Sequence, residues 1–354
     1  MLSPEDFLND TIPGVGAFPA LGLDSPAGST GESGLVPWHE PGYEGTIDYR
    51  IRQLSYSSLL TLHQCPRKFQ LNRLRTTHRT EESEQSGITF SFGHVVGEAI
   101  QLALQGLSED EIIWKMFLMW HTPDIFDSIP KDNKSFWEAV MAAQRFLAMT
   151  KGGFLNEYEL VYVDGKPACE LSFVVILPNG FRLRGFVDAV LVHRTTGKVI
   201  VLECKTTKST TLSPALYQNS SQAVGYSVVL DLLFPGLASY DVLYLVYQTG
   251  SRDYTPMPFA KSYLKRASWI QDILMDVDLI QTYETAQFYP QRGESCLAFF
   301  RECEYFNTCG LSTEYLTKPC TPEEEDKTDY QFVLKIEDLI RAQLALVEPT
   351  TELT

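Results

Sequence analysis

The feature that most constrains the fold is a switch, midway along the chain, from helical periodicity to strand-like alternation. Residues 157–204 are rich in Val, Ile, Leu and Phe, and turn signals occur at Asn179-Gly180 and at residues 195–197. Short apolar runs separated by glycine-containing turns are typical of paired strands. The pattern therefore predicts an antiparallel pair in which residues 184–193 run against residues 198–205.

Three charged residues interrupt these apolar runs. Because side chains alternate along a strand, Glu203 and Lys205 project from the same face. A hairpin that closes near residues 195–196 places Asp188 nearly opposite Glu203. Two converging carboxylates supply the oxygen ligands that Mg²⁺ prefers, and a lysine can orient or help to deprotonate a water. The spacing favours an apparatus that hydrolyses phosphodiesters. Exposed charges at the end of a strand are the alternative.

Segments of helical periodicity surround the predicted strands, so an α/β fold is expected. A polar loop is expected at residues 76–90, before a helix over 93–106. The other expected elements are amphipathic helices within 108–150, helices near 215–233 and 259–285, and a strand at 240–247.

The net charge of −16 is unevenly distributed. Residues 1–48 carry eight acids and no Lys or Arg, and residues 321–354 carry nine acids and three bases. Residues 50–80 carry seven bases and no acid, which suggests either a phosphate-facing patch or a solvated basic helix face. The composition excludes a protein coated all over in positive potential, but it is compatible with a local basic groove.

These shifts in composition divide the chain into three parts. We expect a flexible arm rich in Gly and Pro at 1–48, a folded domain at 49–320 and an acidic tail at 321–354. The N-terminal residues lack the basic region of a signal peptide. No apolar stretch approaches the roughly 18 residues that a membrane helix needs. A soluble, cytoplasmic protein that does not enter membranes is therefore expected.

Cysteine and histidine add candidate ligands. Seven unevenly spaced cysteines suggest a metal or cluster site in preference to a disulfide framework. His94, near the start of a predicted helix, could supply an imidazole ligand, although a single helical histidine is more often structural. Gln222 and Tyr226 share a helix face because they are four residues apart, but an ordinary core helix has the same spacing.

Five motifs stand in a defined order along the chain. They are the segment 57–71 (SSLLTLHQCPRKFQL), Gly93-His94, Gly185-x-x-Asp188, Glu203-x-Lys205 and Gln222-x-x-x-Tyr226. Together they resemble the motifs of RecB-type nucleases of the PD-(D/E)XK superfamily, over about residues 54–310. The likeness is greatest to RecB and AddB nuclease domains and to CRISPR-associated and phage-encoded exonucleases. It implies a restriction-endonuclease-like fold, in which helices flank a mixed central sheet and a helical insertion occupies about 108–150.

The resemblance implies a role for each matching residue. The metal ligands would be His94, Asp188, Glu203 and the carbonyl oxygen of Cys204. Lys205 would position the attacking water and stabilise developing charge. The Cys204 thiol should point away from this group, so a role as a nucleophile is not expected.

Other residues would contact the nucleic acid or support the site. Gln222 and Tyr226 would order the active site and the DNA strand beside it. Glu170, which precedes an apolar strand, resembles an acidic position common in these domains. The phosphate contacts would come from Arg67, Lys68, Arg73 and Arg75.

The cysteines form a second constellation. Several relatives of this type join the two ends of the nuclease domain with a [4Fe-4S] cluster, held by one early and three late cysteines. The matching residues here are Cys65, Cys296, Cys303 and Cys309. Four thiolates suit either this cluster or Zn²⁺. Cys296 departs from the usual spacing, because it stands seven residues before Cys303 and Phe300 occupies the expected site. Cys169 is expected to act as a small apolar residue of a strand, and Cys320 has no assigned role.

The favoured hypothesis is a DNA exonuclease that uses Mg²⁺ or Mn²⁺ and acts on single- or double-stranded ends in processing, recombination or repair. Its host would be a bacterium, or an infected cell if a phage encodes it, and a helicase or recombination protein is a candidate partner. Two rivals are a non-catalytic nucleic-acid-binding or recombination module that keeps the fold, and a zinc adaptor that binds proteins through its acidic ends. The first need not keep Asp188, Glu203 and Lys205, and the second leaves them unexplained.

Overall fold

The computed structural model describes residues 52–73, 83–120, 134–234, 239–286, 288–298, 301–307, 309–310 and 330–345. The predicted arm at 1–48 lies outside these residues, as do Arg75, Phe300 and Cys320. The described part of the chain belongs to one compact unit, residues 44–354.

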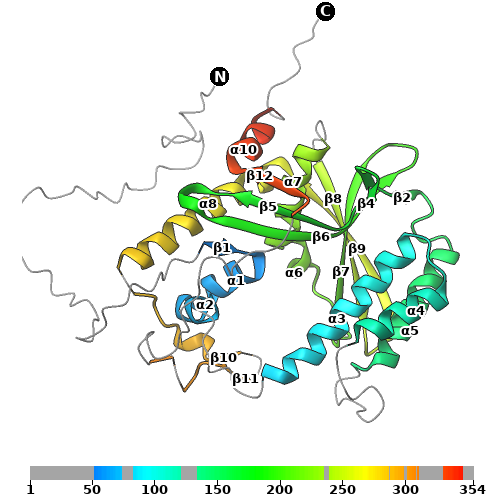
Figure 1. Ribbon diagram of the computed structural model, residues 1–354, viewed down its shortest axis with the longest axis horizontal. Coiled ribbons are helices and arrows are strands. Elements are labelled where there is room, and N and C mark those ends of the chain that lie inside the picture. Colours follow the sequence, from blue (N-terminus) through cyan, green and yellow to red (C-terminus); the bar gives the residue numbers. More distant parts are fainter. Residues whose placement is uncertain are drawn as a thin grey trace, which may run out of the picture. The chain divides into compact units, whose positions relative to one another are not determined.

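A mixed sheet of eight strands forms the centre of the described structure (Figure 1). Along its main path the strand order is β12-β5-β6-β7-β8-β9, and β1 and β2 both pair with β6. β7 lies between an antiparallel partner, β6, and a parallel partner, β8. The strands are β1 (Gln53–Leu54), β2 (Tyr158–Leu160), β5 (Cys169–Ile176), β6 (Arg182–His193), β7 (Val199–Thr207), β8 (Ser239–Gln248), β9 (Asp253–Ser262) and β12 (Phe332–Lys335).

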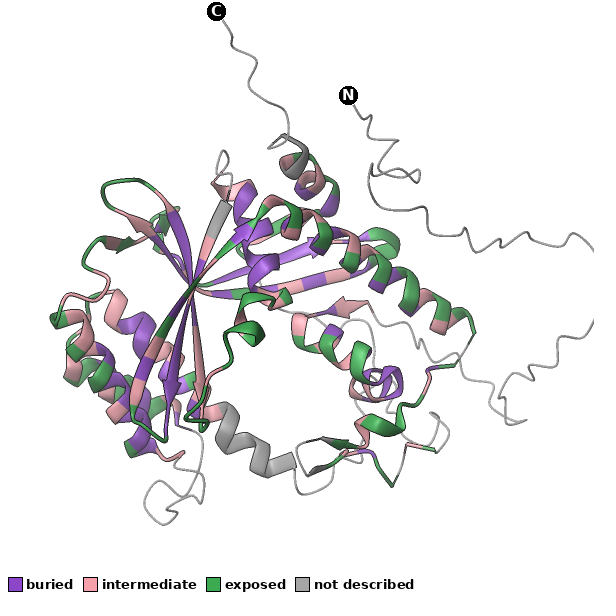
Figure 2. Ribbon diagram, turned by 180° about the vertical axis from the view of Figure 1, so that it is seen from behind, coloured by how far each residue is buried: buried purple, intermediate pink, exposed green. Residues whose placement is uncertain are grey.

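Helices cover both faces of the sheet. One face packs against α1 (Tyr56–Gln64), α7 (Ser221–Leu233), α8 (Tyr263–Thr285) and α10 (Ile336–Ala345), and the other against α3 (Ser83–Leu104), α4 (Glu109–Met119) and α5 (Phe136–Lys151). Val201 of β7 belongs to the first hydrophobic cluster and Leu202 to the second, as strand alternation requires. The buried residues accordingly concentrate on the strands and on the inner sides of the helices (Figure 2). These two cores confirm the predicted layered α/β architecture.

Smaller elements complete the described residues. α2 (Pro66–Arg73) follows α1, and α6 (Pro214–Gln218) precedes α7. Two two-stranded ribbons, β3 (Tyr162–Val163) with β4 (Lys166–Pro167) and β10 (Leu297–Ala298) with β11 (Arg301–Glu302), lie apart from the main sheet.

The predicted hairpin is present. β6 and β7 pair antiparallel, with Val192 opposite Val199 and Ala189 opposite Leu202. The turn contains Gly197 at φ +68°, a left-handed conformation that glycine adopts without steric strain. The register that follows places Asp188 next to Glu203, as the spacing predicts.

Two element boundaries were wrong. The predicted polar loop at 76–90 overlaps α3, which already begins at Ser83. The predicted helix at 259–285 begins only at Tyr263, because residues 253–262 form β9. Pro256 and Pro258 hide this strand from a propensity argument, since proline is tolerated only where a strand lies at an edge, and β9 is an edge strand.

Part of the segment that composition assigns to an acidic tail belongs to the fold. β12 pairs in parallel with β5, with Phe332 opposite Phe173. In α10, Ile336 and Leu339 are buried in the same core as α7 and α8. These apolar residues are few among many acids, so the net charge of the segment concealed them.

Candidate active site

The candidate catalytic residues lie where β6 and β7 separate. The last paired residues are Ala189 and Leu202, and just beyond them the Cys204 backbone N–H donates to Asp188 Oδ2 at 2.7 Å. The Asp188 carboxylate therefore takes the place of a backbone acceptor at the end of the ladder. This contact fixes Asp188 beside the Glu203–Lys205 segment.

Asp188, Glu203 and Lys205, which we call the carboxylate site, form a charged group in which Glu203 is buried and Asp188 and Lys205 are half-buried. The Glu203 side chain is 1% exposed, and its Oε1 accepts a hydrogen bond from Lys205 Nζ at 2.5 Å. Its other oxygen, Oε2, is buried and has no hydrogen-bond partner among the described residues. An unpartnered carboxylate oxygen is costly to bury, so a cation or a hydrogen-bond donor would be favourable at this point.

The pKa shifts follow from this crowding. Burial, and then the neighbouring negative charge of Glu203, raise the pKa of Asp188 well above its usual value. Burial likewise raises the pKa of Glu203, against the opposing effect of Lys205. Burial alone would lower the pKa of Lys205, but the charges of Glu203 and Asp188 outweigh it and raise that pKa. Two carboxylates and one ammonium thus share a poorly solvated space, with negative charge in excess.

α7 supplies the predicted glutamine and tyrosine. The Gln222 side-chain oxygen accepts a hydrogen bond from Lys205 Nζ at 3.2 Å, and its amide nitrogen donates to the Tyr226 hydroxyl at 2.6 Å. Gln222 and Tyr226 are one helical turn apart and face the side of β7 that bears Glu203. The structure therefore brings five predicted residues into one connected group.

His94 is exposed on α3 and interacts electrostatically with Glu98. Among the described residues, no three His, Cys, Asp or Glu side chains come together as a metal-holding group. Asp188 and Glu203 supply two carboxylates at the candidate site, and His94 and the Cys204 carbonyl stay predicted ligands. The oxygen chemistry of the carboxylates and the unpartnered Oε2 fit a hard divalent cation.

Acidic residues on the α3 side extend the site. Glu170 interacts electrostatically with Asp188 and Glu203, and it accepts a hydrogen bond from the buried Gln101 amide at 2.9 Å. Glu98 lies nearby, and burial followed by the charge of Glu170 raises its pKa. The sequence placed Glu98 and Gln101 on the same helix face as His94, four and seven residues after it, but a role was predicted only for Glu170.

The Cys204 side chain packs on the opposite face of the sheet from Glu203, against the cluster that contains α3. Burial raises the pKa of its thiol well above the usual value, so little thiolate forms. Both observations agree with the expectation that this thiol is not a nucleophile. Cys169 likewise packs against the α3 cluster, as predicted for a small strand hydrophobe.

A cavity of about 230 Å³ brings Cys65 together with three cysteines that lie more than 200 residues later in the sequence. Cys65, Cys296, Cys303 and Cys309 all line it, and we call this group the cysteine pocket. The four are free thiols and do not form a close metal-holding group within the described chain. Backbone and side-chain contacts hold the two sides together, because Arg67 N–H donates to the Pro290 carbonyl at 3.1 Å and Ser295 Oγ to the Gln64 carbonyl at 2.7 Å.

Arg67 does not face solvent as a phosphate contact would. It is 9% exposed, and its guanidinium donates to the Cys309 carbonyl at 3.1 Å and to Gln70 Oε1 at 2.5 Å. The sequence pattern could not distinguish these internal contacts from an exposed basic face. Lys68 is half-buried beside Glu304, at 3.5 Å. The Arg73 side chain and all of Arg75 lie outside the described residues.

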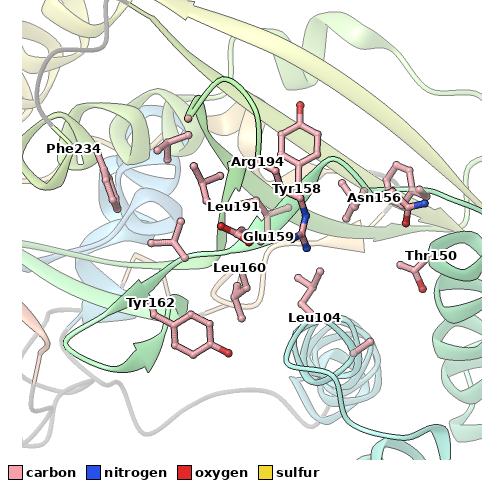
Figure 3. A pocket seen from close by; sticks show the side chains of 17 residues that line it. Leu104, Thr150, Asn156, Tyr158, Glu159, Leu160, Tyr162, Leu191, Arg194 and Phe234 are labelled. Carbon is pink, nitrogen blue, oxygen red and sulfur yellow. Dashed lines mark hydrogen bonds and ion pairs between the residues drawn. The ribbon is translucent and has the colours of Figure 1, made fainter.

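A larger cavity, of about 830 Å³, contains none of the predicted catalytic residues. The ends of α3 and α5, β2 and the β6–β7 turn line it, with Arg194 paired to Glu159 at 3.1 Å (Figure 3). Cavity size therefore does not locate the site. Shifted pKa values are the better guide, because strongly perturbed groups concentrate at functional sites, and Asp188 and Glu203 form such a pair.

The fold and the carboxylate site define a protein of the nuclease class, and comparison with known proteins identifies the family. Residues 53–310 match the family described as the PD-(D/E)XK nuclease superfamily. The chain belongs to this superfamily. A search of curated proteins returned no match.

Two solved structures illustrate the likeness. A crystal structure from Eubacterium rectale, provisionally named an exonuclease, is 13% identical, with 69% of this chain and 86% of that chain covered and a TM-score of 0.43. A crystal structure described as SSO0001 is 14% identical, with 67% and 76% covered and a TM-score of 0.27.

Proposed function

We propose that the protein is a deoxyribonuclease that uses Mg²⁺ or Mn²⁺ to hydrolyse phosphodiester bonds at DNA ends. The observation that carries this proposal is the pair formed by the half-buried Asp188 and the buried Glu203 beside Lys205, with Glu203 Oε2 left without a partner among the described residues. Two poorly solvated carboxylates that share one ammonium are unfavourable unless a cation joins them. Family membership makes a phosphodiester the expected substrate bond.

Asp188, Glu203 and the Cys204 carbonyl would hold the metal ion, and His94 stays a predicted ligand. A bound divalent cation supplies positive charge that polarises a phosphate and lowers the pKa of a water. Asp188 is held in place by the Cys204 backbone N–H, and Glu203 by Lys205, so neither carboxylate needs to reorganise. Charged groups that are already oriented before the reaction stabilise the transition state most effectively.

Lys205 acts as a donor. In the metal-free site the charges of Glu203 and Asp188 raise its pKa, so the amine is held there as an ammonium and a hydrogen-bond donor. It can orient an attacking water and stabilise the negative charge that develops on the phosphate. Gln222 limits the directions open to this ammonium, because its side-chain oxygen accepts one of the three N–H bonds.

Exonuclease action, as distinct from internal cleavage, rests on the motif resemblance to RecB-type enzymes. A role in DNA processing, recombination or repair has the same basis. Neither rests on the cavity or charge pattern of the described residues.

We also propose that the cysteine pocket holds a [4Fe-4S] cluster, with Zn²⁺ as the alternative occupant. Four free cysteines line one small cavity, and they join α2 to the 290–310 segment. Thiolates are the ligands that both groups require. The cavity would need to contract around the group, because no close metal-holding set exists among the described residues.

The test of the nuclease proposal is digestion of end-labelled single- and double-stranded DNA with Mg²⁺ or Mn²⁺. Wild type should degrade linear DNA, and Asp188→Ala and Lys205→Ala should not. Intact circular DNA of the same sequence distinguishes exonuclease action from internal cleavage, because an exonuclease leaves it uncut. Equal degradation by all three proteins would refute the site. No degradation by wild type would favour a non-catalytic binding module.

The test of the cluster proposal is an anaerobic preparation. A [4Fe-4S] cluster gives a brown protein that absorbs at about 400 nm, whereas zinc is colourless and is detected by elemental analysis. A protein that carries neither iron nor zinc in stoichiometric amount contradicts the proposal. That result would not bear on the proposed nuclease site.

A further inference from the structure

Tyr56 enters the carboxylate site from the first turn of α1. Ser55 caps this helix, because its side chain accepts from the Ser58 N–H while the Ser58 hydroxyl lies 2.8 Å from the Ser55 N–H. The Tyr56 ring lies edge-on to Tyr226 at 5.4 Å and tilted against Trp269 at 6.2 Å. The capped helix end and the two rings leave the phenol little freedom to move.

Two glycines create the space for this ring. A Cβ on Gly225 would lie 2.5 Å from the Tyr56 hydroxyl oxygen and 2.6 Å from the Trp269 ring. A Cβ on Gly185 would collide with the Phe173 ring and lie 3.1 Å from the Tyr56 ring. Gly185 belongs to the motif that contains Asp188, and Gly225 stands between Gln222 and Tyr226. The backbone near both motifs is thus shaped around Tyr56.

The hydroxyl at the end of this slot has no partner. Among the described residues, the Tyr56 oxygen is buried without a hydrogen bond, and so is Glu203 Oε2. One is a donor and the other an acceptor. The charge of Glu203 also acts on the phenol, adding to the effect of burial in raising the pKa of Tyr56 well above its usual value. The phenol therefore keeps its proton and remains a donor.

We propose that Tyr56 is a positioning residue for Glu203, acting through one buried water that accepts a hydrogen bond from the Tyr56 hydroxyl and donates one to Glu203 Oε2. Lys205 holds Oε1 and Tyr56 orients Oε2, so the carboxylate plane is fixed from two sides. Oε2 has two lone pairs, so one stays available to a cation. This inference rests on the proposed function, because a fixed carboxylate matters most when it holds a metal ion.

A hydrogen-bonded neighbour of this kind affects metal affinity more than packing. Loss of a residue that orients a metal ligand typically weakens metal binding by about 10- to 100-fold. Tyr56→Phe removes the hydroxyl alone and keeps the ring between Tyr226 and Trp269. The matched control is Tyr289→Phe, because the Tyr289 hydroxyl is also buried without a partner, whereas its charged neighbours are Glu284 and Arg52.

The first measurement is Mn²⁺ affinity, determined by calorimetry without DNA. Tyr56→Phe should bind Mn²⁺ at least about 10-fold more weakly than wild type, and Tyr289→Phe should match wild type. Equal affinities of Tyr56→Phe and wild type would overturn the inference while leaving the proposed nuclease function intact.

The second measurement needs no metal. Melting temperatures of wild type, Tyr56→Phe, Glu203→Leu and the double variant form a cycle. We expect Tyr56→Phe to lower the melting temperature in wild type but not in the Glu203→Leu background, where no acceptor remains. Additive shifts would overturn the inference. If wild type binds no Mn²⁺, the proposed metal site fails, and this cycle alone decides whether Tyr56 and Glu203 are coupled.

Discussion

The carboxylate site and the cysteine pocket are built on different kinds of backbone. The first lies on two long strands, β6 and β7, between two hydrophobic clusters. The second lies among turns and two-residue strands, and its own cluster of buried residues contains only Leu71 and Tyr305 within the described chain. The sheet holds the carboxylates in place despite their repulsion. The cysteine segments have little apolar surface to hold them together.

The difference indicates what a bound group adds at each place. At the carboxylate site a cation adds charge, and the geometry exists before it binds. At the cysteine pocket a cluster or metal adds cohesion, since binding free energy at such sites contributes to folding. Mutations in the carboxylate site should therefore reduce activity, whereas mutations in the cysteine pocket should reduce stability.

The largest expected effect is on catalysis. Lys205→Ala should lower the rate of DNA cleavage by at least about 100-fold, because it removes the ammonium that stabilises developing charge. The rate is measured on end-labelled DNA at saturating Mg²⁺. Asp253→Asn is a suitable control, because that exposed acid pairs with Arg145 away from the site. If Lys205→Ala lost much of its thermal stability as well as its activity, the carboxylate site would also hold the fold together. The proposed difference between the two regions would then be contradicted.

The next effect should appear in stability. Cys303→Ser is expected to remove the bound iron or zinc and to lower the melting temperature by several degrees, because the pocket loses its cross-link. Metal analysis and thermal unfolding measure the two. Cys169→Ala, which alters a strand residue outside the pocket, should keep the metal content. Retention of full metal content by Cys303→Ser would remove this residue from the ligand set.

A smaller effect is expected for Arg67→Ala. Its guanidinium hydrogen bonds are internal, so the variant should lose about 1.5–3 kcal/mol of stability while the salt dependence of DNA binding stays unchanged. Denaturant unfolding and binding titrations at several salt concentrations measure these quantities. A salt slope reduced by about one unit would instead restore Arg67 as a phosphate contact.

The smallest expected effect concerns pH. The folded-state pKa of Asp188 is raised, so the native protein binds this proton more tightly than the unfolded chain. The group therefore destabilises the metal-free protein as the pH rises from the ordinary carboxyl range, about 4, through the raised pKa. The melting temperature of wild type minus that of Asp188→Asn should fall as the pH rises over this window. Addition of Mg²⁺ should reverse the fall. A difference that does not change with pH would argue that Asp188 is not crowded.

Much of the fold was predictable because its signals are local. The β6–β7 hairpin follows from alternation and a glycine turn, and its register then places Asp188 beside Glu203. Gln222 and Tyr226 follow from helical spacing. β9 was missed because its prolines suit only an edge strand, and an edge is defined by the whole sheet.

The unpredicted parts depend on contacts between distant segments. Arg67 belongs to a basic stretch, yet its guanidinium meets the Cys309 carbonyl more than 200 residues away. The close approach of the Tyr56 ring to Gly225 is equally non-local, since nothing near either residue in the sequence indicates it. His94 fits a motif but is exposed on α3. Only the three-dimensional arrangement distinguishes these cases.

The parallel pairing of β12 with β5 has a consequence for synthesis of the chain. β5 emerges from the ribosome about 160 residues before its partner, so its apolar edge stays open while the rest of the sheet is being made. Pairings of such long sequence separation form slowly. The nascent protein therefore passes through a stage in which one edge of its sheet can pair with other chains, and termination before β12, short of residue 332, would prolong that stage indefinitely.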